Sequence, residues 1–75
     1  MKHKAGIAVG ERAYTAVREM FPGKSLAEIA RIVGCKRQTI HWWKTGCAPE
    51  SIYLQRLCFL GADIDWILTG RRKNT

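Results

Sequence analysis

Acidic residues are scarce in this chain of 75 residues, where six Asp and Glu stand against thirteen Lys and Arg. Long apolar runs are missing, and no stretch approaches the roughly 20 residues that a membrane-spanning helix needs. The apolar patch near the N-terminus is interrupted by glycine and charge, so it is too short for the core of a signal peptide. We therefore expect a cytoplasmic protein with no membrane partner.

Cysteine is sparse, and the spacing of the cysteines excludes a C-x-x-C motif and a zinc site. Cys35, Cys47 and Cys58 form no C-x-x-C pair, and with His3 and His41 they do not give a zinc-ligand spacing. We expect no metal and no cofactor. Cys35 and Cys58 are interpreted as small apolar residues of the interior in a reducing cytosol, and Cys47 as a loop residue.

Groups that enzymes use are also lacking. The only serines are Ser25 and Ser51, each at the expected start of a helix with no base nearby. The chain has no glycine-rich phosphate loop, and Asp63 and Asp65 are better explained as a helix cap and its neighbour than as a catalytic pair. The sequence predicts that the protein is not an enzyme.

Helical periodicity is what the chain does have. Its length fits one domain, which at this size buries roughly 60% of its unfolded surface. No segment alternates between apolar and polar residues as a strand would. We expect an all-α fold with a loose N-terminus at residues 1–6 and five short helices: from about Ile7 or Gly10 to Phe21, from the cap Ser25 to Gly34, from Arg37 to Lys44, from Pro49 to about Leu60, and from Asp63 to Gly70.

The second helix has the clearest start. Ser25 and Glu28 have the spacing of a capping box, in which each side chain accepts a hydrogen bond from the other residue's backbone N–H. An apolar stripe at helical spacing follows, formed by Leu26, Ile29, Ala30 and Val33.

Positive charge is concentrated in one segment and in one tail. Residues 24–45 hold five basic residues against one acidic residue, a local balance of +4, and the tail at residues 71–75 adds three more basic residues. Residues 46–70 hold one basic residue against three acidic ones. This distribution suits a polyanion site, although a solvated basic surface kept for solubility would give the same total.

The segment "GCKRQTIHWWKTG", residues 34–46, places two tryptophans among basic residues. With the preceding helix it fits a helix-turn-helix, in which two short helices are joined by three or four residues with a glycine at the corner. Ala30 is the small residue needed where the helices cross, and Gly34 is the corner. Ile40 and Trp43, three residues apart, are expected to face the interior.

The opposite face of the helix at residues 37–44 is polar and basic. In a helix-turn-helix this helix lies in the major groove, so Arg37 could bind guanine and Gln38 adenine through paired hydrogen bonds. Trp42 would offer its ring to a thymine methyl group or a sugar, or else would pack on a neighbouring helix or a dimer partner. For His41 we favour the role of a solvated surface residue, and a phosphate contact is the second option. The residues expected at phosphates or beside the base contacts are Lys24, Ser25, Lys36, Thr39, His41, Lys44 and Thr45.

Two stretches of the chain carry a family resemblance. "SLAEIARIVGCKRQTIHWWKTG" resembles the helix-turn-helix of the phage repressor and XRE (lambda-repressor-like) regulators, and "LGADIDWILTG" is similar to the end of the DNA-binding domain of phage CI-type repressors. Together they cover about residues 24–70. The resemblance implies a five-helix domain that binds operator DNA as a dimer on an inverted repeat, with base contacts at Arg37, Gln38 and Trp42. Trp42 departs from the family, since many relatives have a smaller or polar residue there.

The resemblance and the charge pattern predict a sequence-specific transcriptional regulator, a phage or prophage-type repressor that binds double-stranded DNA as a homodimer. CI-type repressors continue into a linker and a second domain, so a chain ending at Thr75 is expected to be a small stand-alone regulator or an N-terminal piece. The alternative is a protein-binding module, such as an antirepressor or adaptor. RNA binding is a weaker option, because the deep A-form groove does not admit such a helix. The residues expected to form the dimer interface are Ile64, Trp66, Ile67 and Leu68.

Overall fold

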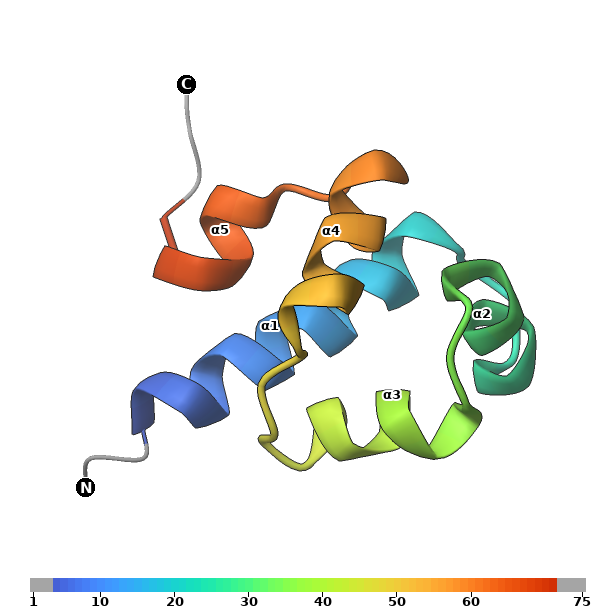
Figure 1. Cartoon of the computed structure of the whole chain (residues 1–75), viewed down its shortest axis with the longest axis horizontal. Helices are drawn as coiled ribbons and strands as arrows, with labels where there is room; N and C mark the ends of the chain where they lie inside the picture. Colours follow the sequence, from blue (N-terminus) through green and yellow to red (C-terminus); the bar gives the residue numbers. More distant parts are fainter. Residues whose placement is uncertain (1–3, 72–75) are drawn as a thin grey trace.

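The computed structural model describes residues 4–71, with side chains from Ala8 onward, and the regular secondary structure in that range is entirely helical. The all-α class and the number of helices agree with the prediction. α1 packs against α3 and α5, α2 packs against α3 and α4, and α4 packs against α5 (Figure 1). The helices are α1 (Lys4–Met20), α2 (Leu26–Val33), α3 (Arg37–Lys44), α4 (Ser51–Phe59) and α5 (Ile64–Thr69).

The core receives side chains from all five helices, and every buried side chain from Ala8 to Arg71 belongs to an apolar residue. Trp43 of α3 is the largest of them, with only 2% of its surface exposed. Ile40, on the same face of α3, is fully buried. The prediction that this face points inward is confirmed. The remaining buried hydrophobic residues are Ala13, Ala16, Val17, Ile29, Ala30, Val33, Leu57 and Ile67.

α1 begins earlier than predicted, at Lys4, so residues 4–6 are helical rather than loose. Lysine and alanine favour helices, and the single glycine among these residues costs only about 1 kcal/mol. Residues 1–3 lie outside the described range. Further along α1, Gly10 is buried against the loop that follows α3. A Cβ at Gly10 would lie 2.8 Å from the carbonyl carbon of Cys47, so only glycine allows this approach.

α4 begins later than predicted. Glu50 is its N-cap in extended conformation, and Pro49 lies one residue before the cap instead of in the first turn. Pro49 is buried, so its ring packs into the molecule instead of beginning the helix.

The prediction for Cys58 was wrong, because this residue lies on the solvent-facing side of α4 and is exposed. Cys35 is half-buried and packs against the core, in agreement with the prediction. Cys47 is an exposed loop residue, also as predicted.

The two tryptophans of α3 should respond oppositely to truncation. Trp43→Ala should lower the free energy of unfolding by about 3–5 kcal/mol, because it leaves a large cavity in a thin core. Trp42→Ala should change it by less than about 0.5 kcal/mol, because Trp42 is 53% exposed. Urea unfolding followed by circular dichroism measures both values. Similar losses in the two variants would contradict the assignment of faces.

Candidate nucleic-acid interface

α2 starts with the predicted capping box. The backbone N–H of Glu28 donates to the Ser25 hydroxyl at 3.2 Å, and the backbone N–H of Ser25 donates to a Glu28 carboxylate oxygen at 2.9 Å. That second bond is the main reason why the pKa of Glu28 lies below its ordinary value, and the charges of Lys24 and Arg31 act in the same direction. The box fixes where α2 begins and leaves Ser25 and Lys24 exposed in front of it.

The turn between α2 and α3 consists of residues 34–36. Gly34 has φ 87°, in the left-handed region, and the backbone N–H groups of Gly34 and Cys35 donate to the Ala30 carbonyl at 2.8 and 2.9 Å. This arrangement terminates α2 in a Schellman-type cap. Ala30 is only 3% exposed, which fits its predicted place at the crossing of the two helices.

Arg56 of α4 holds the end of α2 in place. Its Nη1 donates to the Gly34 carbonyl at 2.7 Å and to the Val33 carbonyl at 3.4 Å, and its guanidinium carbon lies 5.6 Å from the centre of the Tyr53 ring. A cation at this position also interacts favourably with the negative end of the α2 dipole. This role could not be predicted from local patterns, because Arg56 is 22 residues from Gly34 in the chain.

α3 has two clearly different faces. Ile40 and Trp43 are buried, whereas the predicted base-contacting residues Arg37, Gln38 and Trp42 are all exposed. Arg37 and Gln38 occupy the first turn of α3, and with Leu26 and His41 they line a shallow depression between α2 and α3. The structure therefore brings Arg37 and Gln38 together, whereas Trp42, also exposed, borders a separate pocket between α3 and α4.

The residues expected at phosphates are exposed, except for Thr39. Lys36 is the N-cap of α3 and is exposed, and Lys44 lies in the last turn with its Nζ 5.8 Å from the centre of the Tyr14 ring. The Thr45 hydroxyl donates to the Trp42 carbonyl at 2.9 Å and so caps the end of α3. Thr39 is half-buried and faces a pocket beside α3.

The predicted dimerisation residues do not form one exposed surface. Ile67 is fully buried in the monomer core, so its assignment to a dimer interface was wrong. Ile64 and Trp66 are half-buried and pack against the same core. Leu68, with 46% of its surface exposed, is the member of the set that remains outside. The core takes up more of α5 than expected because α5 packs against both α1 and α4.

The part of the chain that the structure describes holds no group of three or more His, Cys, Asp or Glu residues that could bind a metal ion. None of its helices combines the length and apolar character that crossing a membrane requires.

The lowered pKa of Glu28 makes the capping box dependent on pH. Because the folded-state pKa lies below the unfolded one, the carboxylate contributes stability above about pH 5 and loses it as pH falls through the folded-state pKa. The wild-type chain should therefore have a higher free energy of unfolding than Glu28→Ala at neutral pH. The difference between the two should become smaller in acid. Urea unfolding between pH 3 and 7 measures this difference in free energy of unfolding. A difference that does not change with pH would exclude the carboxylate as its source.

Gly34→Ala should destabilise the turn by more than Gly23→Ala. Both glycines have positive φ, where alanine costs roughly 1–2 kcal/mol, but only at Gly34 would a Cβ meet another group, Arg56 Nη1 at 2.8 Å. Unfolding measurements on both variants, repeated with Arg56→Ala, separate the two effects. The excess cost at Gly34 should disappear when Arg56 is absent; an excess that persists would mean that Arg56 is not the group in contact.

Comparison of this chain with protein-family models, curated protein sequences and solved structures gives no match. Its function is therefore inferred from the residues and geometry described above.

Proposed function

We propose that this chain is a sequence-specific DNA-binding transcriptional regulator, a repressor of the phage CI or XRE (lambda-repressor-like) kind, with α2 and α3 as its helix-turn-helix. The observation that carries the proposal is the division of α3, where Ile40 and Trp43 are buried while Arg37 and Gln38 are exposed in the first turn. A helix presented in this way can enter the major groove with its N-terminal residues toward the bases.

Base recognition would come from the exposed side chains of α3. Arg37 has the geometry to bind guanine through two hydrogen bonds, and Gln38 to bind adenine in the same manner, each contributing about 1–3 kcal/mol of discrimination. Trp42, more than half exposed, supplies an apolar surface for a thymine methyl group or a sugar.

Backbone contacts would come from cations at both ends of α3. Lys36 lies directly before the helix and Lys44 in its last turn, so the two ammonium groups flank the base-contacting residues. Lys24 and Ser25, both exposed in front of α2, add contacts on the neighbouring element. Such contacts fix orientation and give salt-dependent affinity without carrying sequence information.

The proposal includes a homodimer on an operator with two half-sites. Of the residues predicted for its interface, Leu68 is the most exposed, since Ile67 belongs to the monomer core and Ile64 and Trp66 are half-buried.

A second candidate, a protein-binding module on the same fold, is favoured by an exposed apolar surface. Phe59 is 80% exposed, and with Ile32 and Leu60 it borders a shallow groove between α2 and α4. Clusters of this kind on a monomer often mark protein interaction sites.

A random-library DNA selection at low and at physiological salt tests the proposal. Enrichment of an inverted repeat, with half-sites one helical turn or about 10 base pairs apart, is the expected result. Salt-sensitive binding with no enriched sequence would contradict sequence-specific recognition. Absence of binding even at low salt would favour the protein-binding alternative.

Three substitutions in α3 separate the roles of its exposed residues. Arg37→Ala and Gln38→Ala should each reduce discrimination between operator and mismatched duplexes by about 1–3 kcal/mol. Lys44→Ala removes the same charge as Arg37→Ala from the same helix, so it is the matched control. It should weaken binding to all sequences alike and reduce the salt slope by about one. Fluorescence anisotropy at several salt concentrations measures these effects, and unchanged preference in both Arg37→Ala and Gln38→Ala would refute the assignment.

A further inference from the structure

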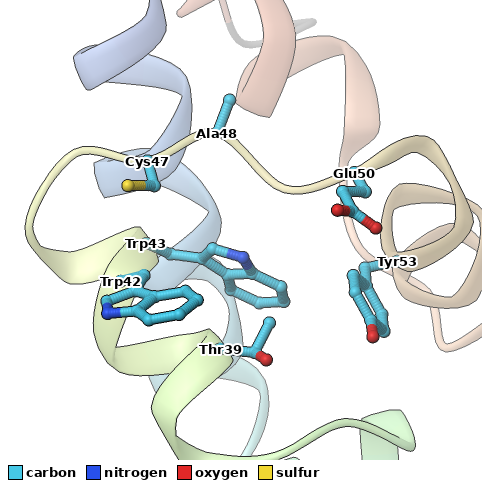
Figure 2. A pocket seen from close by; sticks show the side chains of 7 residues that line it. All are labelled: Thr39, Trp42, Trp43, Cys47, Ala48, Glu50 and Tyr53. Carbon is cyan, nitrogen blue, oxygen red and sulfur yellow. The ribbon is translucent and has the colours of Figure 1, made fainter.

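A pocket of about 240 Å³ lies between α3, α4 and the loop that joins them. Figure 2 shows aromatic side chains from both helices on its walls, with loop residues above them. Its volume is below that of pockets for drug-sized ligands, which begin at roughly 300 Å³, so it suits a small ligand. The lining residues are Thr39, Trp42, Trp43, Cys47, Ala48, Glu50 and Tyr53.

Three of these residues provide aromatic rings. Trp42 and Trp43 come from α3, and Tyr53 comes from α4. The ring centres of Trp43 and Tyr53 are 6.2 Å apart with their planes inclined by 55°, so the two rings form an angled wall instead of a closed stack. The faces of aromatic rings carry negative potential, which attracts cations, and several rings around one space strengthen the effect.

Glu50 adds a negative charge to this aromatic surface. It is the N-cap of α4, but its side chain makes no capping hydrogen bond. Within the part of the chain whose side chains are described, its carboxylate has no hydrogen-bond or ion-pair partner. In Figure 2 the carboxylate lies at the same end of the pocket as the Tyr53 ring, on the side that faces Trp43.

We propose that this pocket binds a small organic cation of the quaternary ammonium class. A compact cation would contact the exposed ring of Trp42 and the half-buried ring of Tyr53 while the Glu50 carboxylate neutralises its charge. An anion is disfavoured, because it would meet both a carboxylate and the negative faces of the rings.

Arg56 also lies against Tyr53 but does not occupy this site. Its guanidinium carbon is 5.6 Å from the centre of the Tyr53 ring, yet its Nη1 donates to the carbonyls of Val33 and Gly34, and Arg56 is not among the residues that line the pocket. The pair does show that Tyr53 already accepts a cation at one position. The proposed ligand uses the neighbouring space. Because Trp42 is also a proposed DNA contact, the test below uses the chain without DNA.

The test is an NMR titration of the full chain with choline and, separately, with its uncharged isostere 3,3-dimethylbutan-1-ol. Choline should shift the indole N–H signal of Trp42 in a saturable manner, and the isostere should not. Trp66 of α5 lies outside the pocket and is the internal reference. Equal responses to choline and the isostere, or no response to either, would overturn the proposal.

Two variants tie the response to the pocket. Glu50→Gln should weaken choline binding at least about fivefold, because it removes a charge next to the ligand. Glu11→Gln removes one exposed carboxylate from α1 and is the matched control, with unchanged binding expected. Trp42→Ala should weaken binding roughly twofold to thirtyfold. If Glu50→Gln and Glu11→Gln bind choline equally well, the carboxylate does not hold a cation and the proposal fails.

Discussion

The burial of Ile40 and Trp43 is the interaction on which the rest of this structure depends. α3 has only eight residues, and isolated helices shorter than about 12–15 residues are marginal in water. α3 is therefore helical because these two side chains are held in the core, where α1 and α2 pack against the helix. Once one face is fixed inward, the helical period turns Arg37 and Gln38 outward, so the same contact that stabilises α3 also presents its polar side chains.

Two arginines bind the C-terminal ends of neighbouring helices. Arg56 of α4 donates to the carbonyls at the end of α2, and Arg12 of α1 donates to the Ile67 and Leu68 carbonyls at the end of α5, at 2.9 and 3.3 Å. In each case a glycine in left-handed conformation terminates the helix beside the arginine. Part of the positive charge of the chain therefore has a structural role, and the total of +7 overstates what is available to a polyanion.

Local patterns in the sequence predicted those features that depend on neighbouring residues within one helix. The bounds of α3, the Ser25–Glu28 capping box and the burial of Trp43 follow from side-chain spacing within one or two turns, and all agree with the structure. The features that were missed depend on contacts between distant segments. Ile67 is taken up by the core because α5 packs on α1 and α4, and Arg56 reaches the turn after α2 from 22 residues away. No periodicity within a single helix contains that information.

We propose that the outward face of α3 is the surface that contacts DNA. Its most direct test is to record amide NMR signals of the ¹⁵N-labelled chain while a duplex is added. If α3 contacts DNA, the largest shifts should fall on residues 36–45 and on the start of α2, while Phe59 and Leu60 remain unaffected. Shifts centred on Ile32, Phe59 and Leu60, with α3 unchanged, would contradict it.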